Sequence, residues 1–170
     1  MSTSYCEAWF RARKVATKPL TEAEARKRHE KKGALYTVLL GDSARPSTII
    51  EIVSLDSLQV EYYDESLRRV GYYQFVIQSN GQLFMVAAGF NQFDGDNRMP
   101  IWSRRLSFKP NGQVMSFEED HIRDPGMETV VEKTVDVSLN WEPYPEFGDY
   151  ASIARFHRDK PAAEQVGVTG

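Results

Sequence analysis

The fold of this chain is decided by residues 70–90, which read VGYYQFVIQSNGQLFMVAAGF. Asn80-Gly81 in the middle of this stretch is a strong β-hairpin signal, because both residues tolerate the positive φ that a two-residue turn requires. This turn pairs Ile77 with Phe84 and leaves apolar side chains on both faces of the hairpin. A strand that is apolar on both faces is typical of a sheet interior that is covered on both sides. We therefore expect this hairpin at the centre of the fold.

Segments with the alternation of β-strands surround this hairpin. They are rich in β-branched and aromatic residues, and the linkers between them are short. Short linkers predict antiparallel neighbours, because a parallel pair needs a crossover of about a dozen residues or more. The expected class is mainly β (α+β): a single twisted antiparallel meander sheet of about seven or eight strands, with closure into a barrel left open. The predicted strands are 34–40, 47–54, 58–64, 70–78, 82–90, 101–109, 113–119 and 130–141.

A second hairpin is predicted around residues 110–113, which read PNGQ. Pro110 has no N–H group, which disfavours a plain two-residue turn, so we expect a four-residue loop. This loop pairs Arg105 with Glu118 across the two strands. Both hairpins carry Asn-Gly-Gln at the turn, and we interpret them as two turns that solve the same steric problem.

One surface helix is predicted near the N-terminus, over about residues 21–32. Thr21 and Glu24 match a capping box, in which each side chain binds the backbone N–H of the other residue. The helix is polar almost all round, so it should lie on the surface. We expect a single domain over 1–160 and a flexible tail over 161–170.

Composition excludes several classes of protein. The chain has 170 residues, of which 41% are hydrophobic and 26% charged, as in a globular domain. Its net charge of −3 disfavours nucleic acid as a partner. No apolar run approaches the roughly 18 residues of a membrane span, and no signal peptide is visible. The single cysteine, Cys6, cannot form an internal disulfide, which fits a reducing compartment and predicts a cytoplasmic location.

The sequence contains no P-loop, Rossmann fingerprint, nucleophile elbow or H-E-x-x-H motif. Residues 94–97 (DGDN) begin like a calcium loop, but Met99 and Arg105 stand where that loop needs glycine and glutamate. Residues 118–121 (EEDH) lie on a predicted strand, where neighbouring side chains point to opposite faces. We therefore predict no catalytic residue, metal or cofactor. Enzymatic activity stays open, with the absence of activity favoured.

The candidate binding residues are aromatic or lie in a long loop. Residues 62–63 and 72–73 are tyrosine pairs on strands, so one ring of each pair points to each face. Tyrosine is enriched at interface anchors. Residues 91–99 form a long polar connection in an otherwise tight meander, and such loops often carry function. The candidate partner contacts are Tyr62, Tyr72, Phe93, Asp94, Asp96 and Arg98.

These features favour a non-catalytic intracellular module that binds another protein. The most concrete version is a bacterial immunity-type protein that masks a toxin or another basic partner, because acidity would help to cover a basic active site. The alternative is a small-ligand-binding or enzymatic β-barrel or cup. A further alternative is a structural subunit of a phage or secretion particle. No membrane partner is expected.

Overall fold

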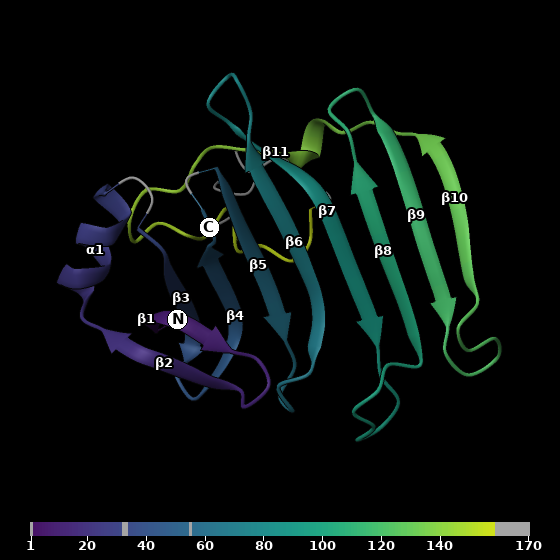
Figure 1. Cartoon of the computed structure of the whole chain (residues 1–170), viewed down its shortest axis with the longest axis horizontal. Helices are drawn as coiled ribbons and strands as arrows, with labels where there is room; N and C mark the ends of the chain where they lie inside the picture. Colours follow the sequence, from purple (N-terminus) through teal and green to yellow (C-terminus); the bar gives the residue numbers. More distant parts are fainter. Residues whose placement is uncertain (1, 32–33, 55, 159–170) are drawn as a thin grey trace, which may run out of the picture.

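The computed structural model describes residues 2–31, 34–54 and 56–158. It confirms a mainly β class with one α-helix (Figure 1). The elements are β1 (Thr3–Phe10), β2 (Val15–Leu20), α1 (Glu22–Glu30), β3 (Tyr36–Asp42), β4 (Arg45–Ile52), β5 (Ser57–Tyr63), β6 (Arg69–Ile77), β7 (Leu83–Gln92), β8 (Trp102–Phe108), β9 (Gln113–Asp120), β10 (Glu128–Thr134), the 3₁₀ turn η1 (Ser138–Asn140) and β11 (Trp141–Glu142).

The strands form one open antiparallel sheet in the order β10-β9-β8-β7-β6-β5-β4-β3-β1-β2 (Figure 1). Strands β3 to β10 are a meander, as the short linkers predict. The β1–β2 hairpin adds to the free side of β3, and the short β11 pairs with the start of β7. The eleven strands exceed the predicted seven or eight, because β1, β2 and β11 were not expected. Within the described residues β2 and β10 remain separate edges, so the alternative of a closed barrel does not apply.

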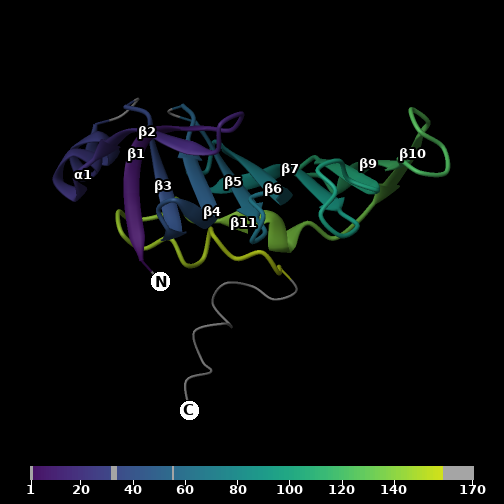
Figure 2. The same cartoon turned by 90° about the horizontal axis from the view of Figure 1, so that it is seen from below.

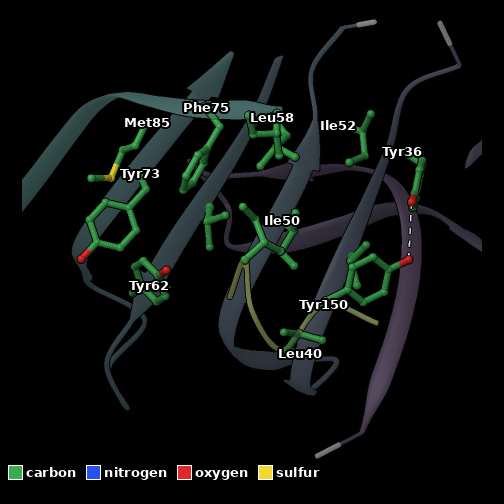
Figure 3. Close-up of a cluster of buried hydrophobic side chains, with 14 of the residues drawn as sticks. Tyr36, Leu40, Ile50, Ile52, Leu58, Tyr62, Tyr73, Phe75, Met85 and Tyr150 are labelled. Carbon is green, nitrogen blue, oxygen red and sulfur yellow. Dashed lines mark hydrogen bonds between the residues drawn. The ribbon is translucent and has the colours of Figure 1, made fainter. Parts of the chain in front are cut away.

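The main core lies on one face of the sheet, which we call the inner face. Figure 2 shows the segment 141–158 running along this face, beneath β3 to β7. Figure 3 shows the side chains that this segment covers, including Ile50 and Phe75, both fully buried. The hydroxyl groups of Tyr36 and Tyr150 lie 3.4 Å apart and link β3 to the covering segment. Apolar residues of β3 to β7 are therefore buried by the last described part of the chain.

A smaller core lies on the opposite face, which we call the outer face. Here Cys6 and Trp9 of β1 pack against Leu39 and Ile49. The thiol is fully buried, and this burial raises the pKa of Cys6 to about 11. The β1–β2 hairpin thus covers the outer face over β3 and β4.

The two Asn-Gly turns adopt the same three-residue loop. Gln78 N–H donates to Gln82 O at 2.8 Å, and Lys109 N–H donates to Gln113 O at 2.9 Å. The glycines have φ of +78° and +89°, and each asparagine Oδ1 accepts from the backbone N–H of the following glutamine, at 3.0 and 3.1 Å. The interpretation of a shared steric solution is therefore confirmed, whereas the predicted two-residue and four-residue loops are wrong.

The loop length changes the register of both hairpins by one residue. Ile77 lies opposite Leu83 rather than Phe84, and Arg105 lies opposite Phe117 rather than Glu118. In the first hairpin a bulge in β7 restores the expected pairing farther from the turn. The central hairpin is buried on both faces close to its turn, where Phe75 and Phe84 are fully buried, and is covered only on the inner face beyond it.

The predicted strand 130–141 is wrong for residues 135–140, which lie outside any strand, and Trp141 belongs to the separate strand β11. Strand β10 ends at Thr134, and the chain then leaves the edge and returns through η1 to pair β11 with β7. Val137 and Asn140, predicted on a strand, are buried in this return. In Figure 2, β9 and β10 project beyond the segment 141–158, so the sheet is a single layer there. Every residue of β10 is exposed.

The helix α1 confirms the predicted capping box. Thr21 Oγ1 accepts from Glu24 N–H at 3.3 Å, and Glu24 Oε2 accepts from Thr21 N–H at 2.8 Å. Ala25 is its buried residue, as expected for a surface helix. The predicted end at residue 32 and the predicted tail 161–170 lie outside the described residues. No helix in the described ranges is long and apolar enough to cross a bilayer.

Candidate functional site

Apart from the buried Glu61 and the buried turn end of the central hairpin, the outer face over β5 to β9 is open and holds a groove of about 500 Å³. We call it the outer groove. Its walls combine aromatic rings with arginines and a small polar network, and the side chains used below are Arg69, Tyr72, Ser103, Arg105, Phe117 and His121. Five of these six residues stand on paired strands, and His121 directly follows the end of β9, so the sheet fixes their relative positions.

A glycine lets the ring of Tyr72 lie across the sheet. Tyr72 of β6 pairs with Gly89 of β7, and a Cβ atom at position 89 would lie only 2.1 Å from Tyr72 Cε1. The space that a side chain would fill is therefore occupied by the tyrosine ring. The guanidinium of Arg69 stacks on this ring, with its central carbon 5.0 Å from the ring centroid. The pair forms an aromatic–cation platform in the groove.

The same pattern recurs on the next strands. Arg105 pairs with Gly89 on one side and with Phe117 on the other, and its guanidinium lies 5.2 Å from the Phe117 centroid. Glu128 of β10 forms an ion pair with Arg105 and so fixes the end of that side chain. One cross-strand row therefore runs over the outer face, consisting of Glu61, Tyr72, Gly89, Arg105, Phe117 and Val130.

A hydrogen-bonded chain of three side chains lies at one end of the groove. Ser103 Oγ is 2.9 Å from His121 Nε2, and His121 Nδ1 is 3.1 Å from Glu119 Oε1. Ser103 Oγ also donates to Asn91 Oδ1 at 2.8 Å. The serine proton can therefore bond either to the imidazole or to the amide oxygen. The connectivity is that of a nucleophile, a base and an orienting carboxylate.

The cross-strand row begins at Glu61 of β5, whose carboxylate is fully buried. It accepts hydrogen bonds from Tyr63 Oη at 2.7 Å, Arg69 Nη1 at 2.7 Å and Arg11 Nε at 3.0 Å. Burial alone would raise the pKa of Glu61, but these donors outweigh it and lower the pKa below its ordinary value. The carboxylate is therefore charged and holds Arg69 beside Tyr72.

Glu61 and Glu51 are expected to affect acid stability in opposite directions. The lowered pKa of Glu61 gives stability that is present above its ordinary pKa of 4.5 and is lost as the pH falls toward the folded-state value. Glu61→Gln should therefore flatten the loss of stability below that pH. Burial raises the pKa of Glu51, so Glu51→Gln should make the loss steeper. Urea midpoints measured across the acid range test both signs, and equal slopes for the two variants would contradict the assignment.

The structure separates two of the predicted partner contacts. Tyr62 lies on the inner face and is 5% exposed, and its hydroxyl donates to the carbonyl of Arg155 at 2.9 Å. Tyr72 lies on the outer face and is half-buried in the groove. One flat partner surface cannot contact both rings. Tyr62 is thus a core residue in this structure, and Tyr72 is the accessible tyrosine of the two.

The predicted loop residues lie beside the outer groove. The loop 93–101 joins the end of β7 to the start of β8, so it borders the end that holds Asn91 and Ser103. Arg68 organises it by stacking 4.6 Å from the Phe93 centroid and by donating to two loop carbonyls. Phe93 is half-buried in this contact. The remaining predicted side chains of the loop are exposed, namely Asp94, Asp96 and Arg98.

The one-residue register change also alters the predicted charge pairs. Glu118 pairs with Arg104 at 3.0 Å on the inner face, so the predicted Arg105–Glu118 pair is wrong. Glu119 and His121 share the outer face, as alternation requires. Among the residues that the structure describes, no group of three His, Cys, Asp or Glu side chains could hold a metal ion.

Sequence reasoning missed Arg69, Phe117 and the Ser103–His121 contact. The alternating pattern on 117, 119 and 121 was a usable signal, because it places these three side chains on one face. The pairing with Ser103 needed the correct register. Comparisons with protein-family models, with curated proteins and with solved structures found no match.

Proposed function

We propose that this protein is a protein-binding module whose partner contacts the outer groove and the loop 93–101. The observation that supports it is the row of Tyr72, Arg105 and Phe117 on an uncovered sheet face. Tyrosine and arginine dominate the residues that carry binding energy at protein interfaces. The stacked guanidinium groups hold the rings in place, which lowers the entropy cost of binding.

The partner we propose is a basic protein, and an immunity-type protein that masks a toxin is the most concrete case. The exposed Asp94 and Asp96 and the net charge of −3 support a basic partner. Charges at the rim of an interface mainly accelerate association. Replacing both aspartates by asparagine should therefore slow association, most strongly at low ionic strength, and leave dissociation nearly unchanged.

Tyr72→Ala and Tyr62→Ala form a matched pair that tests the proposed surface. Tyr72→Ala should weaken binding by about 2 kcal/mol, roughly thirtyfold, with little loss of stability. Tyr62→Ala should reduce stability and leave the affinity of the folded fraction unchanged, because its ring lies in the core. The partner is captured from the source cells with the tagged chain and identified, and each variant is then titrated with it calorimetrically.

Two outcomes would contradict the binding proposal. If Tyr72→Ala and the asparagine variant bind the captured protein as well as the parent chain does, the outer groove is not the interface. If the chain recovers only a metabolite, the alternative of a small-ligand site is favoured. Urea midpoints measured on the same samples separate lost affinity from lost folding.

A second candidate function, acyl-ester hydrolysis, is favoured by the chain Ser103–His121–Glu119. His121 Nε2 would accept the serine proton as Oγ attacks the ester carbonyl, and the imidazolium would return it to the leaving alcohol. Water would then release the acyl group from Ser103. A fluorophosphonate probe should label the parent chain and neither Ser103→Ala nor His121→Gln. If the probe does not label the parent chain, hydrolysis is excluded. The three side chains then form a structural network in which Asn91 accepts the hydrogen bond of the Ser103 hydroxyl.

A further inference from the structure

The two edges of the sheet differ in how open they are to another strand. The edge strand β2 carries Pro19, which lacks an N–H donor, and Lys18, which has a φ of +47°. Such features prevent a further strand from pairing. The edge strand β10 pairs with β9 in an unbroken register over all seven of its residues, Glu128–Thr134. None of these seven residues is a proline, and none has a positive φ.

The free side of β10 is accessible from both faces of the sheet. All of its residues are exposed, and the segment 141–158 ends short of it (Figure 2). Val130 and Val131 are 51% and 49% exposed, so each face of the strand presents an apolar side chain to solvent. A free edge of this kind is a template for another strand. We propose that a second copy of this chain pairs with β10 in antiparallel orientation and joins the two sheets.

The charge pattern of β10 selects a self-pairing register. A two-fold axis normal to the sheet must place one residue opposite its own copy. With the axis at Val131, Thr129 lies opposite Lys133 of the second copy, and Val130 lies opposite Glu132 of the second copy. No like charges then face one another. Opposed residues on paired strands interact directly, so this register is favoured.

A shift of the axis by one residue in either direction brings glutamates together. With the axis at Val130, Glu128 faces Glu132 of the second copy; with the axis at Glu132, that side chain faces its own copy. Like charges directly opposite destabilise a strand pair. In the register centred on Val131, Glu128 faces Thr134 of the second copy, so this side chain keeps its ion pair with Arg105 and meets no like charge. Of the three registers centred on Val130, Val131 and Glu132, only the one centred on Val131 keeps the glutamates apart.

Two lysine substitutions at adjacent, equally exposed positions test this register. Val131→Lys places a lysine opposite its own copy, whereas Val130→Lys places it opposite Glu132 of the second copy. The full-length parent chain should sediment as a dimer in analytical ultracentrifugation. Val131→Lys should raise the dimer dissociation constant by roughly tenfold or more, and Val130→Lys should not. An equal mixture of Val131→Lys and Val131→Glu should recover the dimer as a heterodimer.

A cysteine at the axis gives a second, independent readout. Cys6 is the single cysteine of the chain and is fully buried, so Val131→Cys adds the one accessible thiol. Mild oxidation should yield a disulfide-linked dimer. A parent chain that stays monomeric at every concentration would overturn the proposal. So would equal dissociation of both lysine variants, or a dimer that persists unchanged in Val131→Lys. Circular dichroism and urea midpoints confirm that each variant is folded.

Discussion

Replacing Glu142 by alanine is expected to destabilise the protein by about 3–5 kcal/mol. The Glu142 carboxylate is fully buried beneath the sheet, where it accepts hydrogen bonds from Arg155, Arg158 and Ser152. The two arginine side chains are only 8% and 6% exposed. Removing the carboxylate leaves two buried guanidinium charges without their shared counter-ion. Breaking a buried ion pair in this way costs far more than losing an exposed one.

The free energy of unfolding in urea measures this effect. Ser152→Ala is the matched control, because it removes one hydrogen bond to the same carboxylate at 2.6 Å and should cost about 1 kcal/mol. Arg158 also stacks on Tyr73 and Phe75, at 5.0 Å from each ring centroid, so its displacement should disturb the core beneath β6. A loss within about 1 kcal/mol for Glu142→Ala would show that the arginines find other partners or water.

Alanine at either fully buried phenylalanine of the central hairpin should also cost about 3–5 kcal/mol. Phe75 packs in the inner core, where its ring lies 6.4 Å from that of Tyr73. Phe84 packs against Trp141 of β11, with their ring centroids 4.8 Å apart. Both changes lose apolar burial and leave a cavity that packed neighbours cannot close.

The two phenylalanine variants should differ in their effect on the strand β11. Phe84→Ala should also loosen β11, because Trp141 pairs with residue 84 in the sheet, whereas Phe75→Ala should leave that strand in place. Met115→Ala, at a position that is 41% exposed, is the control and should stay within about 0.5 kcal/mol of the parent chain. Urea midpoints near that of the parent chain for both phenylalanine variants would place the hairpin at the surface.

Strand positions were predictable from the sequence, but register was not. Alternation identified β3 to β9, because an exposed and a buried face leave a period of two in the residues. An Asn-Gly dipeptide such as Asn80-Gly81 occurs in hairpin loops of two, three or more residues. The length of the loop determines which residues of the two strands lie opposite one another. The bulge opposite Gln74 then changes the register once more within the same hairpin. A shift of one residue reassigns charge partners, which is why Arg105 was placed opposite Glu118.

Contacts between distant parts of the chain account for the other differences. The predicted strand 130–141 has a clean alternation, yet it divides at Thr134 because burial of Val137 against the sheet outweighs continued pairing at an exposed edge. Tyr62 and Tyr72 were rightly placed on strands, but which ring is covered depends on the path of residues 141–158. Local patterns cannot show that path, because it depends on packing between segments about 90 residues apart, as in the Tyr62–Arg155 contact.

The segment 141–158 also determines how the protein must behave on the ribosome. Each strand of the meander can pair with its predecessor as soon as it emerges, whereas the segment that covers the inner face is synthesised after all of these strands. At typical rates of translation, the apolar side chains of β3 to β7 stay uncovered for on the order of ten seconds. Docking of Tyr150 and Ile153 closes this face. A nascent chain that is stalled before these residues would present a paired but uncovered sheet, which is a substrate for aggregation and proteolysis rather than a stable intermediate.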